Sequence, residues 1–324
     1  MKKICIAASC YNESANIMTL YNEILKQIEK NNNYKWEILF EDNCSTDNTV
    51  EILRSIASKD KRVKVILNQA NYGPDRSVMN VIFSSDADAV IAMASDLEDP
   101  PELIPEFVTA WEEGYKVAWG QYTSRNENLI LKFFRKIYYK IIAAFSDLKT
   151  ENNVTGFGIY DKSVIDTIRK LGDYIVVFRY ICLELGYDVK YIPFNKPARK
   201  TGKSSYSLLK YYNYAIETLV LTSHAPLHLA STVGFIMLLG SLLVALYYMI
   251  QKFMHWYTFD FGLAPIMIGL FFIGGLQLLF IGIIGEYLSS AIKRVTKRPL
   301  VIEKERINFE ISDSSETLEV NKAK

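Results

Sequence analysis

Residues 36–49, WEILFEDNCSTDNT, join a short apolar run to an acidic and polar turn, and a stretch with helical periodicity follows. A short apolar strand that leads directly into a helix is the repeating unit of a parallel α/β sheet. Ligands of such sheets bind just beyond the carboxyl ends of the strands. The polar residues that begin at Glu41 therefore indicate a binding site as well as a fold.

The same pattern recurs from residue 1 to about residue 125. The expected strands are Lys3–Ala8, Trp36–Glu41, Val63–Asn68, Ala89–Ala94 and Lys116–Tyr122, and the expected helices include Ser14–Glu29 and Asn48–Ser58. Short apolar strands that alternate with helices predict an α/β domain with a mainly parallel, Rossmann-like sheet.

Polar and acidic residues follow four of these strands in turn. The four stretches are Ser9–Glu13, Glu41–Thr49, Asn71–Gly73 and Ala94–Glu102. Each alone could be a helix cap, because Asp, Asn and Ser often occupy that position. Four together indicate a ligand crevice. The sequence contains neither GxGxxG nor GxxxxGK[ST], so a dinucleotide fold or a P-loop is not supported. Carboxylates at a strand end suit a divalent cation that holds a diphosphate.

Two segments near the C-terminus are long, apolar and uncharged. Leu227–Ile250 and Gly262–Ile284 contain no Asp, Glu, Lys or Arg, and each exceeds the roughly 20 residues that cross a bilayer as a helix. Buried core helices rarely run this long without a charge. Four basic residues follow the second segment: Lys293, Arg294, Lys297 and Arg298. The positive-inside rule places this end in the cytoplasm, and two spans then place the N-terminal domain there too.

A basic amphipathic stretch precedes the apolar segments. Leu129–Leu148 has apolar residues on one helical face, and Lys132, Lys136 and Lys140 on another. Such a helix can lie flat on an anionic membrane, although a surface helix that packs on the sheet would show a similar pattern. We expect a second interfacial helix at about residues 205–223. From Glu303 onward the chain is polar, and we expect a loose tail.

The composition excludes several classes of protein. The 324 residues include 37 basic and 36 acidic side chains, which argues against a dedicated nucleic-acid binder. Half of the residues are hydrophobic, so disorder throughout is excluded. The four cysteines form no CxxC pair and stand far from the three histidines, so zinc-site spacing is absent. We expect reduced thiols.

In combination, the motifs at the strand ends resemble those of family 2 glycosyltransferases with the GT-A fold. The resemblance is to the polyisoprenyl-phosphate branch, which contains dolichyl-phosphate mannose synthase and the bactoprenol glucosyltransferases, and it covers roughly residues 3–302. It is nearest to bacterial members with two C-terminal membrane helices. The motifs that carry it are Tyr11-Asn-Glu13, Asp42-x-x-Ser45-Thr-Asp47, Asn71-x-Gly73, Asp96-Leu-x-Asp99-Pro-Pro-Glu102, Arg199–Tyr206, and Gln277 with Gly285-Glu286-Tyr287 and Lys297-Arg298-Pro299.

The resemblance implies a reaction, a cofactor and a location. The reaction is the inverting transfer of a sugar from a UDP-sugar, by default UDP-glucose, to polyprenyl (undecaprenyl) phosphate. The cofactor is a divalent metal, Mg²⁺ or Mn²⁺. The protein would lie in the plasma membrane as a homo-oligomer with both termini cytoplasmic. Residues 1–225 would form the catalytic domain, 226–290 the two-helix membrane region, and 291–324 a basic segment and polar tail.

The resemblance also implies roles for matched residues. The implied catalytic residues are Asp96 and Arg199. The implied nucleotide-sugar ligands are Tyr11, Asn12, Glu13, Asp42, Ser45, Asn71, Gly73, Ser95 and Asp96. The implied acceptor and phosphate ligands are Arg125, Arg199, Ser204, Lys132 and Lys136. Asp96 is the implied metal ligand, with Glu98 beside it.

The chain departs from the family pattern at several positions. Ala94 stands where the first Asp of the metal motif is usual, so metal coordination should weaken or shift, and Glu98 could supply a replacement oxygen. Asn43 and Cys44 replace the Asp and Gly of the usual D-D-G-S. Residues 156–158 are Gly-Phe-Gly where Asp-Phe-Arg often occurs, so an acceptor-side contact would be missing or replaced.

Other functions remain open. A processive polysaccharide synthase would carry a Q-x-x-R-W motif, but none of the four tryptophans follows an arginine. A non-catalytic membrane scaffold descended from the family is suggested by Ala94, whereas the retention of Asp42, Asp96 and Arg199 argues against it. UDP-N-acetylhexosamine and UDP-galactose are alternative donors.

Overall fold

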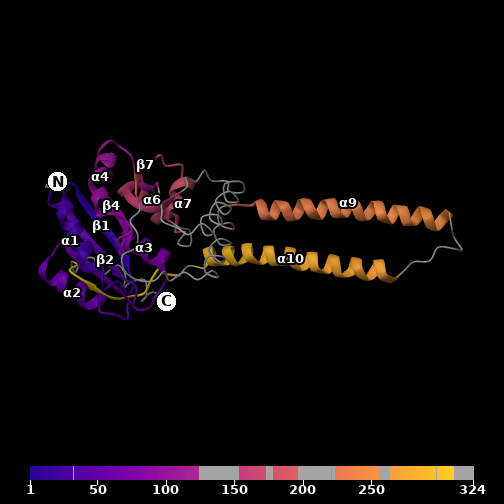
Figure 1. Ribbon diagram of the computed structural model, residues 1–324, viewed down its shortest axis with the longest axis horizontal. Helices are drawn as coiled ribbons and strands as arrows, with labels where there is room; N and C mark the ends of the chain where they lie inside the picture. Colours follow the sequence, from indigo (N-terminus) through magenta and orange to yellow (C-terminus); the bar gives the residue numbers. More distant parts are fainter. Residues whose placement is uncertain are drawn as a thin grey trace. The chain divides into compact units, whose positions relative to one another are not determined.

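The computed structural model describes residues 1–31, 33–123, 153–172, 178–195, 220, 223–254, 263–296 and 298–309. These residues fall into two compact units. One unit contains a β-sheet with helices on both faces, and the other contains two long apolar helices (Figure 1).

In the described residues the sheet has eight strands in the order β7-β5-β6-β4-β1-β2-β3-β8. The strands are β1 (Lys3–Cys10), β2 (Lys35–Asp42), β3 (Val63–Asn68), β4 (Ala89–Ala94), β5 (Val117–Tyr122), β6 (Val154–Asp161), β7 (Val189–Phe194) and β8 (Glu303–Ile307). Strands β4, β1, β2 and β3 are parallel neighbours, whereas β6 and β8 run antiparallel to the strands beside them. The predicted mainly parallel α/β fold is therefore confirmed.

Helices cover both faces of this sheet. They are α1 (Ile17–Ile28), α2 (Thr49–Lys59), α3 (Pro74–Phe83), the short 3-10 helix η1 (Pro101–Leu103), α4 (Ile104–Glu112), α6 (Lys162–Leu171) and α7 (Phe178–Glu184). Successive side chains of a strand point to opposite faces. In β1, Ile4 and Ile6 therefore join the core under α1, α2 and α4, while α3 packs on the other face.

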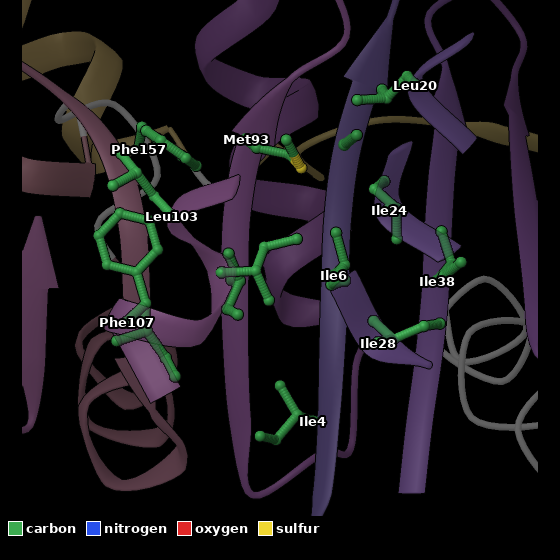
Figure 2. Close-up of a cluster of buried hydrophobic side chains, with 14 of the residues drawn as sticks. Ile4, Ile6, Leu20, Ile24, Ile28, Ile38, Met93, Leu103, Phe107 and Phe157 are labelled. Atoms are coloured by element: carbon green, nitrogen blue, oxygen red, sulfur yellow. The ribbon is translucent and has the colours of Figure 1, made fainter. Parts of the chain in front are cut away.

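The larger core shows why α1 is a helix. Leu20, Ile24 and Ile28 recur every four residues and are fully buried, as the apolar stripe of an amphipathic helix should be. They line up beside Ile6 and Ile38 of the sheet (Figure 2). Burying each such side chain contributes about 2 kcal/mol, so this stripe holds α1 against the sheet.

The strand bounds explain how the polar motifs are placed. The predicted bounds of β3 and β4 are confirmed. Strands β1 and β2 continue past their apolar runs, to Cys10 and Asp42, which pair with each other in the ladder. The first residues of two polar motifs therefore belong to the sheet, and its rigidity fixes their position.

The expected loose tail is wrong for residues 303–307. They form β8, which pairs antiparallel with the edge of β3, and the backbone N–H of Gln69 donates to Ile302 O at 2.8 Å. The Arg54 guanidinium holds the Glu305 carboxylate through two hydrogen bonds, of 2.8 and 2.5 Å. A polar sequence shows no strand periodicity, but an edge strand needs only a free ladder to pair with, and charged residues are common there.

Asn308 should anchor this returning segment. It lies at φ 63° just after β8, and its Nδ2 donates to Ala57 O at 2.7 Å and to Val63 O at 2.8 Å. Asn308→Ala leaves both carbonyls without this donor, so we expect a loss of about 2 kcal/mol of stability, or about 6 °C in Tm. Thermal unfolding in detergent measures it. Lys304→Ala, at an exposed position of β8, is the control and should melt with the native protein. Equal melting of all three proteins would contradict the anchoring role.

The second unit contains α9 (Ala225–Met254) and α10 (Leu263–Val295). The candidate spans in them are Ala225–Met254, with mean hydropathy 2.3, and Phe272–Ile292, with mean hydropathy 1.6, and neither is buried within the protein. The described residues of both predicted apolar segments are thus helical, and each helix is long enough to cross a membrane. Residues 129–148, and all of 205–223 except 220 and 223, lie outside the described residues.

Candidate functional site

Four polar motifs meet at one edge of the sheet. Strands β4, β1, β2 and β3 are parallel neighbours, so their carboxyl ends lie together. Ser9 pairs with Ala94, and Cys10 pairs with Asp42, which brings the loops after three strands side by side. The predicted residues found at this edge are Tyr11, Asn12, Glu13, Asp42, Ser45, Asn71, Gly73, Ser95, Asp96 and Glu98.

Asn12 and Ser45 connect the first two loops. The backbone N–H of Asn12 donates to Ser45 Oγ at 2.9 Å, and the backbone N–H of Thr46 donates to Asn12 Oδ1 at 2.8 Å. Asn12 lies at φ 56°, a left-handed conformation that Asn tolerates better than most residues. These two predicted ligands therefore also build the loops, while the Tyr11 side chain beside them is 42% exposed at the rim.

Glu13 and Asp47 close the turns that start α1 and α2. Glu13 Oε2 accepts from Asn16 Nδ2 at 2.6 Å, and Asp47 accepts from Ser14 N–H at 3.2 Å and Thr49 N–H at 3.0 Å. Burial raises the pKa of Asp47, but the hydrogen bonds from Thr49 and Ser14 outweigh it and leave the pKa below its usual value. Asp47 is thus held ionised as a structural acceptor.

Asp42 presents an unused acceptor. The residue is 1% exposed, and its Oδ2 accepts from the backbone N–H of Ser45 at 2.9 Å. Its Oδ1 is buried and has no hydrogen-bond partner among the described residues. Burial raises the pKa of Asp42, while the hydrogen bonds from Ser45 act against the rise. An unsatisfied buried acceptor costs stability, and a ligand N–H would remove that cost.

Asn43 organises the loop after β3, and its amide explains the departure from Asp. The Nδ2 of this buried residue donates to Asn71 Oδ1 at 3.0 Å and to Gly73 O at 3.2 Å, and its Oδ1 accepts from Tyr72 N–H at 2.9 Å. A carboxylate could accept here but could not donate. Gly73 at φ 87° then turns the chain into α3.

The loop after β4 carries the acidic motif. Ser95 Oγ donates to Ser9 O at 3.0 Å, and the backbone N–H of Ala94 donates to Asp99 Oδ2 at 2.8 Å. Asp96 and Glu98 are half-buried, and Asp96 Oδ1 accepts from the backbone N–H of Glu98 at 3.1 Å. Asp99 thus supports the loop, while the two other carboxylates are half-buried in the same loop at the carboxyl end of β4.

These carboxylates suit a metal that arrives with its ligand. Among the described residues no group of three or more His, Cys, Asp or Glu side chains could hold a metal ion. Mg²⁺ is usually held by one or two carboxylates together with phosphate oxygens and waters. Asp96 and Glu98 fit that smaller role, with a diphosphate supplying further oxygens.

Five predicted residues lie outside the described residues. They are Arg125, Lys132, Lys136, Arg199 and Ser204. The acceptor side of the site therefore remains a prediction from the sequence.

Several polar residues beside these strand ends were not among the predicted ligands. They are Glu41, Asn68, Ser77, Asn80 and Glu303, all in or beside the ends of β2, β3, α3 and β8. Glu41 offered the clearest signal, because a carboxylate directly after the apolar run ILF is unusual.

Comparison with known proteins identifies related chains. Residues 5–169 match the model of the family described as Glycosyl transferase family 2. The putative glycosyltransferase CsbB of Bacillus subtilis (strain 168) is 30% identical over 320 residues, which cover 98% of this chain and 95% of that protein. The prophage bactoprenol glucosyl transferase homolog of Escherichia coli (strain K12) is 24% identical over 305 residues, 93% of this chain and 98% of that protein.

A solved structure aligns with part of the chain. It is glucosyl-3-phosphoglycerate synthase from Mycobacterium tuberculosis in complex with Mg²⁺ and UDP, with a TM-score of 0.48 and 16% identity. The alignment covers 68% of this chain and 78% of that one.

Proposed function

The chain belongs to glycosyl transferase family 2, and on that premise we propose that it transfers a sugar from a UDP-sugar to a polyprenyl phosphate at the cytoplasmic face of a membrane. UDP-glucose and undecaprenyl phosphate are the first pair to test, because a relative that aligns over 93% of this chain is named for bactoprenol and glucosyl transfer. The observation that carries the proposal is the buried Oδ1 of Asp42, which has no hydrogen-bond partner in the part of the chain that the structure describes.

The position of Asp42 favours a uracil base. Since Oδ2 is already occupied by the Ser45 N–H, Oδ1 remains for one ligand donor. Uracil carries a ring N–H between its two carbonyl groups and can donate to such a carboxylate. Adenine and cytosine present a ring nitrogen with a lone pair at the corresponding edge, which a carboxylate would repel. The crevice is therefore proposed to hold UDP with its base at the end of β2.

Asp42→Asn tests the base contact. Asn replaces one carboxylate oxygen by an NH2 donor, so either Ser45 N–H or uracil N–H then faces a donor where it had an acceptor. We expect UDP to bind about 30-fold more weakly, because a hydrogen bond to a charged group contributes about 2 kcal/mol. Isothermal titration calorimetry measures the Kd. Glu51→Gln, in the first turn of α2, is the charge-matched control and should bind UDP normally. Normal binding by Asp42→Asn would remove the base assignment.

The proposed reaction needs no general base. A phosphate monoester has a second pKa of about 6, so the acceptor oxygen is largely ionised near neutral pH. That oxygen attacks the anomeric carbon of the sugar, the bond from this carbon to UDP breaks, and UDP leaves with the electron pair. In-line attack inverts the anomeric centre and passes through an oxocarbenium-like transition state.

The chain's residues then have two tasks. Asp42, Asn12 and Ser45 hold the nucleoside, and Asp96 with Glu98 is proposed to hold a divalent cation beside the diphosphate. Such a cation would neutralise the charge that develops on the leaving UDP. Arg199 is proposed to grip phosphate as well, because its planar fork makes paired charge-assisted hydrogen bonds.

A membrane location suits an acceptor that cannot leave the bilayer. Helices α9 and α10 are proposed to cross it, and the basic residues 293–298 favour a cytoplasmic end. Strands β7 and β8 lie in one sheet although α9 and α10 separate them in sequence. The chain segments before α9 and after α10 are therefore proposed to lie on the same side of the membrane, which supports two crossings in opposite directions. Lys132 and Lys136 are proposed to meet the anionic surface there.

A product assay tests the proposal as a whole. The purified protein in lipid nanodiscs with undecaprenyl phosphate and Mg²⁺ or Mn²⁺ is incubated with a panel of UDP-sugars, and lipid extracts are examined by mass spectrometry. We expect one UDP-sugar to give a lipid-linked sugar with release of UDP. GDP-sugars test the choice of base, because guanine also carries a ring N–H that could donate to Asp42. UDP binding without product from any donor would support the non-catalytic scaffold. If the protein neither binds UDP nor forms a product from any donor, the proposal is overturned.

A further inference from the structure

A carboxylate without an assigned role lies at the centre of the strand ends. Glu41 is 0% exposed. Its Oε1 accepts from Asn68 Nδ2 at 2.7 Å and from Ser77 Oγ at 2.7 Å, and its Oε2 accepts from Asn80 Nδ2 at 2.9 Å. All three partners donate, so the surroundings match an ionised, acceptor-only group.

This cluster continues to the loops that build the crevice. On one side, Ser9 Oγ donates to Ser77 Oγ at 2.8 Å, and Ser9 O accepts from Ser95 Oγ at 3.0 Å, which reaches the loop after β4. On the other side, Asn68 Nδ2 lies 3.4 Å from Asn43 Oδ1, and Asn43 holds the loop after β3. One hydrogen-bonded chain thus links the ends of β4, β1, β2 and β3.

We propose that Glu41 is a positioning residue of the donor site, which holds the Asn71–Gly73 and Ser95 loops in their binding geometry without touching the nucleotide. The inference rests on the proposed UDP-sugar function. Glu41 and Asp42 are neighbours in one strand, so their side chains point to opposite faces of the sheet. Asp42 can then contact the base while Glu41 anchors α3 and the loops behind it.

Opposing effects act on the pKa of Glu41. Burial raises its pKa to about 7, against the lowering effect of the hydrogen bonds from Asn68, Ser77 and Asn80. From β8, the Glu303 carboxylate raises the pKa further and is itself paired with Arg306 at 2.5 and 2.9 Å. The other titratable groups nearby are the adjacent Asp42 and, from β1, Cys10, whose thiol lies 3.4 Å from Glu41 O. The described contacts from α3 and β3 are uncharged.

Protonation of Glu41 would break the chain at Asn68. Asn68 Oδ1 is buried and has no hydrogen-bond partner among the described residues. A protonated Glu41 becomes a donor, and Asn68 offers this buried acceptor for it if its amide turns so that Oδ1 faces the carboxyl group. Its Nδ2 then leaves Asn43 Oδ1, so Asn43, which holds the loop after β3, loses its link to Glu41. Donor affinity should therefore fall as the pH drops below about 7.

Stability should respond to pH with the opposite sign. Because the folded pKa of Glu41 is raised above its unfolded value, the folded protein binds the extra proton between pH 4.5 and about 7. The contribution of this group to stability is present below pH 4.5 and is lost as the pH rises to 7. Ionised Glu41 thus serves binding at the expense of stability, a combination that a purely structural residue would not show.

Glu41→Gln separates these two effects. It removes the charge and leaves one acceptor oxygen among three donors, so at pH 8 we expect UDP to bind about tenfold more weakly while Tm stays equal or rises. At pH 6 the native Glu41 is itself mostly protonated, so the ratio of the two Kd values should approach one. Using this ratio cancels the titration of UDP's own phosphate. Calorimetry with UDP at pH 6, 7 and 8 and thermal unfolding at the same pH values give both readouts.

Two further variants control the experiment. Glu37→Gln changes another buried carboxylate of β2, which pairs with Lys3 and Lys64 at 2.9 Å, and it should leave the Kd unchanged at every pH. Ser77→Ala cuts the chain without altering charge, and it should weaken UDP binding about fivefold even if Glu41→Gln cannot be purified.

The outcomes distinguish this inference from the function on which it rests. If the native protein does not bind UDP, the proposed function falls and the role of Glu41 falls with it. If the native protein binds UDP and Glu41→Gln has the same Kd at pH 8, or a ratio that does not change with pH, the positioning role is overturned while the function stands. Normal UDP binding by Ser77→Ala also counts against the positioning role.

Discussion

Asp96→Asn is expected to lower the rate of sugar transfer about a thousandfold, while UDP binding weakens only about tenfold and the protein still folds. Asp96 is half-buried at the end of β4, and its hydrogen bond from the Glu98 N–H can be kept by an amide oxygen. The charge would be lost where the diphosphate must leave. A cation beside a leaving group acts most strongly in the transition state, so kcat should fall more than affinity.

Single-turnover transfer and UDP calorimetry measure the two effects of Asp96→Asn separately. Glu102→Gln is the matched control, because Glu102 belongs to the same acidic motif but is exposed in η1. It should retain native activity. Full activity of Asp96→Asn would refute the metal assignment, and equal losses in both variants would point to the charge of the whole motif.

Gly158→Ala should have the largest effect on stability, about 3 kcal/mol or about 10 °C in Tm. Gly158 lies in β6, and a Cβ there would be 2.0 Å from Ala118 O and 2.9 Å from Trp119 Cα. These are backbone atoms of β5, so they cannot rotate away as a flexible side chain could. The two strands would have to separate at a paired position of the ladder.

Gly172→Ala provides the comparison for this prediction. Gly172 ends α6 at φ 66°, and no atom of the described residues comes within 4 Å of the place that a Cβ would occupy, so alanine there meets backbone strain but no clash. Its expected cost is about 1 kcal/mol. In thermal unfolding in detergent, Gly158→Ala should therefore have a clearly lower Tm than Gly172→Ala. Equal losses would show that close packing between β5 and β6 is not what requires glycine.

The close contact with β5 also explains why glycine stands at position 158, where the family often has Arg. From the sequence, a glycine in place of Arg suggested a missing contact to the acceptor. In the structure this position has no room for any side chain, because β5 passes directly beside it. The departure therefore has a packing reason within β6, and its neighbours in sequence give no sign of that close approach.

The sequence predicted strand bounds correctly where the apolar run and the hydrogen-bonded pairing of the strand end at the same residue. Strands β3 and β4 have this property, and their bounds were correct. Hydrophobicity could not show that β1 and β2 continue to Cys10 and Asp42, since those residues are held by pairing with each other. Strand β8 was not predicted for a similar reason. It forms by pairing with the edge strand β3, and its own sequence has no apolar strand pattern.

The residues of the candidate site also differ in how far local sequence could predict them. Asp42, Asn12 and Ser45 follow the predicted strands, so local sequence placed them at the edge of the sheet where the structure has them. Glu41 acquires its partners from β3 and α3, which lie 27 to 39 residues away in the chain. No local pattern announces a cluster whose members are brought together only by the order of the strands.

The position of β8 has a consequence for the way in which the protein is made. Translation produces β1 through β7 first, then the two apolar helices, and only afterwards the strand that covers the edge of β3. Until then that edge offers unpaired backbone groups, the kind of surface through which nascent chains aggregate. The sheet is therefore completed only in chains that have been synthesised through both helices, and a chain that stops within them keeps an open edge for quality control to detect.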